Sequence, residues 1–210
     1  MIIKSLRLFD SFDNLDQIEV NSLISWIKNP PLPIQLENYL ANKILYPKAL
    51  PITILDMQID LAILREALRG KPDHPFLNTV LKKIIIPEAF LLNIPNIVSL
   101  TWAFVDGLLF NKKKENWYGD LWSIVVAGNK EEVVGSVLIP QFTSSKDILD
   151  LKMEGHDFKI KAGTLIVLPS LKNKCEIDYK LSNGKILGKQ SSMMEIYGGR
   201  MGLMIDGRII

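Results

Sequence analysis

The sequence predicts an α+β protein whose helices precede its strands. Apolar residues recur at helical spacing through most of the first third of the chain. In the last third, short alternating segments follow one another and are divided by turn residues. Strands and helices do not alternate, which argues against a doubly wound parallel sheet. We therefore expect a helical region over 1–74, a mixed α/β core segment over 75–132, and a C-terminal antiparallel β barrel or sandwich over 133–210.

The first region contains three predicted helices. The first runs to about Lys28, where two prolines stop it, and the second covers residues 34–44. The third covers residues 54–68. Thr53 is a favourable N-cap for this helix, and Asp56 takes the place of the capping-box acid three residues further on.

The middle segment mixes strand and helix. The β-branched run Ile84–Ile86 predicts a strand, which Pro87 ends. Residues 97–110 are apolar on nearly all sides, a pattern typical of a buried helix. After a charged loop, Trp117–Val126 returns to the core as a further apolar segment.

The last region consists of closely spaced strands. Residues from Cys175 to Leu181 alternate between apolar and charged types, so this strand has one dry face and one wet face. Asn183 and Gly184 form a pair typical of hairpin turns. The predicted strands are 133–140, 147–153, 157–160, 164–169, 174–181, 193–196 and 202–205.

Composition limits the classes of function. The net charge is only +2, from 25 basic and 23 acidic side chains, so binding to nucleic acid is not expected. Cys175 is the sole cysteine, so no internal disulfide forms, and a reducing, cytoplasmic location fits best. Proline and acidic residues interrupt the longest apolar windows, so no transmembrane segment is expected. The expected partner is another protein subunit or a second copy of the chain; docking on a membrane complex stays open.

The C-terminal stretch Gly198–Arg208 combines a glycine-rich turn, an apolar run and one Asp/Arg pair. It resembles the closing segment of the methylaspartate (glutamate) mutase accessory proteins. These are actin-like ATPases whose chains commonly end near Gly-Gly-x-Leu-Gly-Leu-hydrophobic-Ile-Asp-Ala-Arg-Gly. The order of several phrases carries the resemblance across nearly the whole chain. The further matching phrases are Leu36–Lys43, Tyr46–Pro51, Ile63–Arg69, Gly135–Pro140 and Gly163–Pro169.

The resemblance implies the C-terminal part of an accessory protein without the N-terminal nucleotide-binding half. The family's second glycine-rich nucleotide turn would fall near Ile86–Asn93, which contains no glycine. Side chains would therefore block a close backbone approach to phosphate, and we expect no ATP hydrolysis by this chain alone and no cofactor. The resemblance also implies an alternative: one half of a split actin-like ATPase, acting as reactivating chaperone for a cobalamin-dependent mutase.

No residue pattern predicts catalysis or a metal site. The two histidines lie in turn sequences without further ligands at metal-binding spacing. Asp206 and Arg208 lie two residues apart on a predicted strand, so they share a face, and we expect a structural ion pair. Gly199 and Gly202 are expected to serve the turn and the close packing of the same strand.

An aromatic cluster extends from the apolar helix into the segment that follows it. Core packing is the default interpretation. The alternative is a docking face, because aromatic side chains are enriched at interfaces. On that interpretation the chain is a non-catalytic subunit or interaction module that docks on a larger protein assembly. The candidate interaction residues are Trp102, Phe104, Phe110, Trp117, Tyr118 and Trp122.

Overall fold

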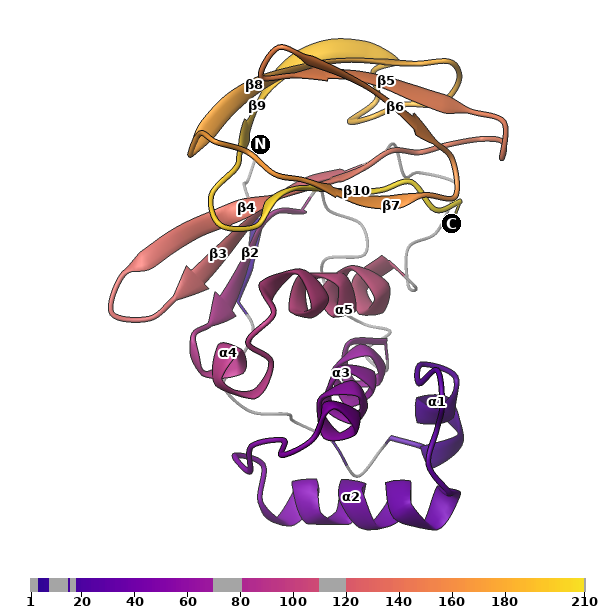
Figure 1. Cartoon of the computed structure of the whole chain (residues 1–210), viewed down its shortest axis with the longest axis vertical. Helices are drawn as coiled ribbons and strands as arrows, with labels where there is room; N and C mark the ends of the chain where they lie inside the picture. Colours follow the sequence, from indigo (N-terminus) through magenta and orange to yellow (C-terminus); the bar gives the residue numbers. More distant parts are fainter. Residues whose placement is uncertain (1–3, 8–14, 16–17, 70–80, 110–119, 210) are drawn as a thin grey trace. The chain divides into compact units, whose positions relative to one another are not determined.

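The computed structural model shows a mixed α+β protein, as the sequence predicts (Figure 1). It describes residues 4–7, 15, 18–69, 81–109 and 120–209. Within that part of the chain, no helix is both long and apolar enough to cross a membrane.

The chain divides into two compact units that are interleaved along the sequence. The strand unit comprises residues 1–8, 78–86 and 113–210, and the helical unit comprises residues 9–77 and 87–112. These limits differ from the three predicted segments, whose borders fall after residues 74 and 132. A strand near the N-terminus joins a sheet made mostly of C-terminal residues. The predicted borders missed this pairing because local patterns do not reveal which distant strands pair.

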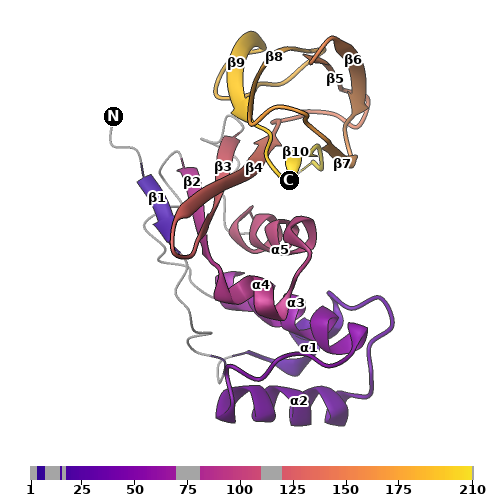
Figure 2. The same cartoon turned by 60° about the vertical axis from the view of Figure 1, so that its left-hand side comes forward.

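The strand unit contains a six-stranded sheet with the order β1-β2-β3-β4-β10-β7 (Figure 2). Two of its pairs are parallel, β1 with β2 and β10 with β4, whereas β3–β4 and β10–β7 are antiparallel. The antiparallel arrangement expected for residues 133–210 is therefore wrong for the pair β4–β10, whereas the other pairs within that region are antiparallel. The strands are β1 (Lys4–Arg7), β2 (Leu81–Pro87), β3 (Asp120–Ala127), β4 (Glu131–Ile139), β7 (Leu165–Leu168) and β10 (Gly202–Asp206).

A second, four-stranded sheet has the order β6-β5-β8-β9 and is antiparallel throughout. In β8 buried and exposed residues alternate strictly, which confirms the predicted dry and wet faces. Each strand predicted beyond residue 133 is present, with ends shifted by a few residues at most. The strands of this sheet are β5 (Ile148–Met153), β6 (His156–Lys161), β8 (Lys174–Leu181) and β9 (Ser191–Tyr197).

Both sheets bury one common core. It joins side chains of β4, β7 and β10 to the dry face of the four-stranded sheet. In the described part of the chain the strands form two separate ladders and do not close into a barrel. The core residues include Leu138, Leu149, Leu151, Leu168, Ile177, Tyr179, Leu181, Ile196, Leu203 and Ile205.

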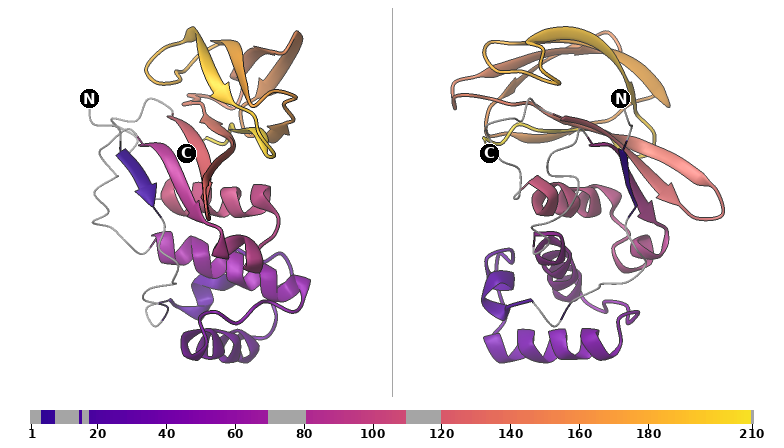
Figure 3. Two further views of the ribbon diagram at one scale, coloured as in Figure 1. Left: turned by 90° about the vertical axis from the view of Figure 1, so that its left-hand side faces the viewer. Right: turned by 180° about the vertical axis from the view of Figure 1, so that it is seen from behind.

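The helical unit contains α1 (Val20–Ile24), α2 (Pro33–Leu45), α3 (Ile54–Arg69), α4 (Ala89–Asn93) and α5 (Ile97–Leu109). In the two views of Figure 3, α3 lies between α2 and α5. The predictions of α2, α3 and α5 are confirmed. The first predicted helix is shorter than expected, and its predicted start lies outside the described residues.

Local sequence explains where α3 begins. The Thr53 hydroxyl accepts a hydrogen bond from the Asp56 backbone N–H at 3.1 Å, and the Asp56 carboxylate accepts one from Thr53 N at 2.8 Å. This reciprocal pair is the predicted capping box. Near its other end α3 packs closely on α5, because a Cβ at Gly107 would lie 2.6 Å from the Leu68 Cβ.

Candidate functional site

Three of the predicted aromatic docking residues lie in the described part of the chain, and two of these three are buried. Phe104 is fully buried in α5 and meets Phe90 edge-on, with ring centroids 6.2 Å apart. Trp122 is fully buried in β3. These two side chains are core residues and offer no surface to a partner, so the docking role expected of them is corrected. Trp102 is 36% exposed. The remaining candidates, Phe110, Trp117 and Tyr118, lie outside the described residues.

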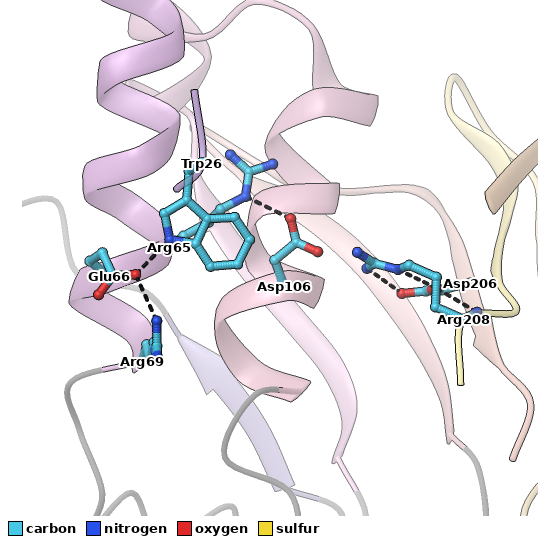
Figure 4. Close-up of polar contacts among 7 residues, drawn as sticks. All are labelled: Trp26, Arg65, Glu66, Arg69, Asp106, Asp206 and Arg208. Carbon is cyan, nitrogen blue, oxygen red and sulfur yellow. Dashed lines mark hydrogen bonds and ion pairs between the residues drawn. The ribbon is translucent and has the colours of Figure 1, made fainter. Parts of the chain in front are cut away.

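The C-terminal pair forms a closed, bidentate contact (Figure 4). Arg208 Nε lies 2.8 Å from Asp206 Oδ1, and Arg208 Nη2 lies 2.6 Å from Asp206 Oδ2. The Arg208 backbone N–H also donates to Oδ1 at 3.1 Å. Asp206 is fully buried, so its two oxygens are engaged within the strand end. This geometry suits a structural pair, which stays a prediction.

The two glycines named from the sequence adopt left-handed backbone conformations. Gly199 has φ +58° and Gly202 has φ +80°. A Cβ at Gly199 would lie 2.8 Å from the Val134 carbonyl oxygen, and a Cβ at Gly202 would collide with the Leu168 carbonyl oxygen. Any side chain at either position would therefore meet both conformational strain and neighbouring backbone.

A polar network braces the helical unit along α3 (Figure 4). Arg65 Nε lies 2.6 Å from Asp106 Oδ2 of α5, and the Arg65 guanidinium lies 5.3 Å from the centre of the Trp26 ring. The Trp26 indole N–H donates to Glu66 Oε1 at 2.5 Å, and Arg69 pairs with the same oxygen at 3.3 Å. The carboxylates of Asp106 and Glu66 each have a cationic or indole partner. The network therefore serves to connect α3 to α5 and to Trp26.

A second network lies deeper, between α2 and α3. The side chains of Lys43 and Asp60 are 2% and 0% exposed, and their Nζ and Oδ2 atoms lie 2.8 Å apart. The Tyr39 hydroxyl donates to Asp60 Oδ1 at 3.0 Å. Burial raises the pKa of Asp60, and the neighbouring Lys43 opposes that rise. Burial, reinforced by the Asp60 charge, raises the pKa of Tyr39.

This buried pair also holds the loop that joins α2 to α3. Lys43 Nζ donates to the Ala49 carbonyl oxygen at 2.8 Å. At the far end of the loop, the Asp56 carboxylate accepts a hydrogen bond from Ile52 N at 3.1 Å in addition to the one from Thr53 N. The backbone of the loop is therefore fixed at both ends by side chains from the two helices.

The same loop and the start of α3 present apolar side chains to solvent. Ile52 is 93% exposed and Ile54 is 73% exposed, although the backbone beneath them is fixed. We call the group the apolar shelf and define it as Leu50, Ile52, Ile54 and Leu55. The sequence contains a signal that points to it: Leu50 and Ile52 flank Pro51 in a connection, where polar residues are usual.

The outer face of the four-stranded sheet has the opposite character. Asp150 of β5 lies opposite Lys159 of β6 and Lys180 of β8. In the next exposed row, Lys152 lies opposite Asp157 and Asp178. A shallow depression runs over these two rows. Charges of opposite sign thus alternate across three strands, and the face as a whole attracts neither anions nor cations strongly.

The described residues contain no group of three or more His, Cys, Asp or Glu side chains that could hold a metal ion. Cys175 is buried, and burial raises the pKa of its thiol, which disfavours the reactive thiolate. In comparisons with known proteins, no family model, curated protein or solved structure matches this chain.

Proposed function

We propose that this chain is a non-catalytic protein-interaction module that docks on a larger protein assembly through the apolar shelf. One observation carries the proposal: Ile52 is 93% exposed in a loop whose backbone is fixed by Lys43 and Asp56. The proposal keeps the function expected from the sequence and moves its surface from the Trp102–Trp122 region to the α2–α3 connection. The strand unit, proposed to be a two-sheet sandwich, then carries the charged, water-facing surface.

The fixed backbone supports docking rather than accidental exposure. A partner that covers an apolar side chain gains about 25 cal/mol for each Å² removed from water. A flexible loop loses part of this gain, because its side chains and backbone must be ordered on binding. Here the buried Lys43–Asp60 pair and the capping box have already ordered the loop, so little of the gain is lost.

The charge of the shelf favours a protein partner over a membrane surface. Between residues 44 and 55, Lys48 is the one charged residue. The acid nearest in sequence, Asp56, follows directly after this range. Binding to anionic lipid usually requires several basic residues near the surface, each worth about 1 kcal/mol. An apolar protein surface needs no such charge. The resemblance to mutase accessory proteins makes a cobalamin-dependent mutase complex the first assembly to examine.

Site-specific photo-crosslinking in the source cells tests the proposal. A benzophenone amino acid at position 52 should form a discrete adduct with one protein, identified by mass spectrometry. The same probe at Leu171, which is 98% exposed in the strand unit, serves as the matched control. A Leu50→Lys change in the chain that carries the probe should remove the adduct, with stability altered by about 0.5 kcal/mol or less.

Three outcomes would contradict the docking function. One is the same set of adducts from positions 52 and 171, which would indicate random collision. Another is an adduct from position 52 that survives Leu50→Lys, because the shelf would then not be the surface recognised. Absence of any adduct at position 52 would also count against the proposal.

A further inference from the structure

The connection between β8 and β9 contains the only Asn-Gly pair of the sequence, Asn183–Gly184. The Asn183 side chain is exposed, so water reaches it. An asparagine loses its side-chain amide when the next backbone nitrogen attacks Cγ and closes a five-membered succinimide ring. Glycine in the next position favours this attack, because it has no Cβ to crowd the nitrogen and its backbone reaches more conformations.

The structure holds the two reacting groups together. The Gly184 N–H donates to Asn183 Oδ1 at 3.0 Å, so the attacking nitrogen lies beside the amide that it would attack. Among the hydrogen bonds of the described residues, the Gly184 nitrogen makes none to a backbone carbonyl. No helix or strand therefore has to open before this nitrogen becomes available.

The amide nitrogen of Asn183 belongs to a hydrogen-bond chain with one possible direction. Asn183 Nδ2 donates to Thr143 Oγ1 at 2.5 Å, and Thr143 Oγ1 lies 3.0 Å from Asp147 Oδ2. An ionised carboxylate only accepts hydrogen bonds, so the Thr143 hydroxyl gives its single proton to Asp147 and must accept from residue 183. An N–H at position 183 meets this requirement, whereas a carboxylate does not.

Deamidation would put an acceptor where the chain of hydrogen bonds needs a donor. In the first step, a bond forms between Gly184 N and Asn183 Cγ. The bond from Cγ to Nδ2 breaks, and ammonia leaves with the proton from Gly184 N. Water then adds to one of the two ring carbonyls and opens the ring to aspartate or isoaspartate. Neither step changes an oxidation state, so water is the one co-reactant.

Both products are incompatible with the packing around this corner. The aspartate carboxylate would face Thr143 Oγ1 with no proton between the two oxygens. Isoaspartate also adds one methylene to the main chain before Gly184, where even a Cβ would collide with the Gln141 carbonyl oxygen. The same segment is bound to Gln141 by two backbone hydrogen bonds of 2.8 and 3.1 Å with Lys185. A longer main chain would displace them.

We propose that Asn183 is a site of spontaneous deamidation, and that its products weaken the attachment of the β8–β9 connection to the segment between β4 and β5. The strand unit then loses stability with age at one defined position. Every residue involved lies in the strand unit. The proposal therefore goes beyond the docking function and does not depend on it.

Peptide mapping by mass spectrometry tests the reaction after the full chain has been incubated at mildly alkaline pH. The peptide that contains residue 183 should gain about 1 Da and become a substrate for enzymatic methylation of isoaspartyl groups. Its rate of gain should rise with pH, because the attacking nitrogen must lose its proton. Asn129 is the internal control, since it is exposed in the β3–β4 turn but precedes Lys130. Asn183→Gln should abolish the gain, because its ring would need six members.

Thermal melts test the structural consequence with Asn183→Asp, which reproduces one product. This variant should lower the Tm by about 3–6 °C at pH 7, because the Thr143 hydroxyl loses its donor. The same change at the other turn, Asn129→Asp, should lower it by about 1 °C or less. In a Thr143→Val background the loss from Asn183→Asp should shrink, since the two changes share one contact.

Three results would overturn the proposal. The first is no mass gain at position 183 in the folded chain under conditions that modify the urea-unfolded chain. The second is an equal gain at positions 183 and 129. The third is an Asn183→Asp variant as stable as the wild type. The crosslink from position 52 should persist in Asn183→Asp, so the docking function and the deamidation site can fail independently.

Discussion

The outer face of the four-stranded sheet and the exposed surface of the α2–α3 connection meet solvent in opposite ways. On the sheet, opposite charges face one another across β6, β5 and β8, in the rows Lys159–Asp150–Lys180 and Asp157–Lys152–Asp178. On the helical side, twelve consecutive residues from Ile44 to Leu55 include one charge, and Ile52 is almost fully exposed.

The difference separates a surface suited to water from one suited to a partner. Cross-strand charge pairs keep a sheet soluble and oppose edge-to-edge association, as do the lysines of the edge strand β6. Exposed apolar residues give no such protection. The structure nevertheless fixes their backbone with a buried ion pair, which in general contributes little net stability. The pair is better explained as a device that sets the geometry of the loop.

The largest expected effect follows from removing the buried support of the helical surface. Asp60→Ala should lower the free energy of unfolding by about 3–5 kcal/mol, because Lys43 is left buried without its carboxylate. Chemical denaturation measures the change. The combined change Lys43→Met with Asp60→Leu should recover at least half of the lost stability while the crosslink from position 52 weakens. Full docking in that double variant would show that the pair does not set the geometry of the shelf.

Next in size is a change that affects the strand unit and leaves both exposed surfaces intact. Gly202→Ala should cost about 2–3 kcal/mol, because strain at positive φ adds to a collision with the Leu168 carbonyl. Gly163→Ala is the control, since Gly163 also has positive φ but open space around its Cβ position. It should cost about 1 kcal/mol by the same denaturation measurement. Equal losses in the two variants would remove the collision from the explanation.

A smaller and pH-dependent effect is expected where β5 begins. Although burial disfavours its charged form, hydrogen bonds from Thr143 and Ser144 lower the pKa of Asp147. A lowered folded-state pKa adds stability above the unfolded value of about 4, and this stability is lost as pH falls through the folded value. Asp147→Ala should therefore cost about 1–2 kcal/mol at pH 7 and less in acid. A loss that is independent of pH would contradict this assignment.

The smallest effect is expected on the charged sheet face. Lys152→Glu should change stability by about 0.5 kcal/mol or less, because exposed ion pairs contribute little and are screened by salt. The side chains of Lys152 and Asp157 are 70% and 77% exposed, which fits such a small contribution. The crosslink from position 52 should not change in this variant. A large loss of association in this variant would invert the roles assigned to the two surfaces.

The elements that depend on neighbours in sequence could be predicted. The capping box of α3 needs only Thr53 and Asp56, and the alternation in β8 needs only a period of two. Pairings between distant strands could not be predicted in this way. The parallel pairing of β10 with β4 was one that the sequence did not reveal. The hydrogen bonds that define a sheet are made by backbone, so side-chain patterns carry little information about partners.

Burial was the least predictable property of the candidate sites. Trp122 and Phe104 were expected as anchors on one interpretation, yet other elements cover them completely. Conversely, Lys43 is a residue type expected in water, and it is buried because Asp60 of the next helix faces it. The shelf escaped prediction for the same reason, since Ile54 and Leu55 resemble the start of any helix until their surroundings are known.

Hydroxyl-radical footprinting of the chain within its purified native assembly tests the central claim most directly. The extent of oxidation of the shelf side chains and of Met193 is compared between the assembly and the isolated chain. Met193 is 61% exposed on the outer face of the four-stranded sheet. Docking through the shelf predicts strong protection of Leu50 and Ile52 in the assembly and unchanged oxidation of Met193. Protection of Met193 with continued labelling of the shelf would contradict it.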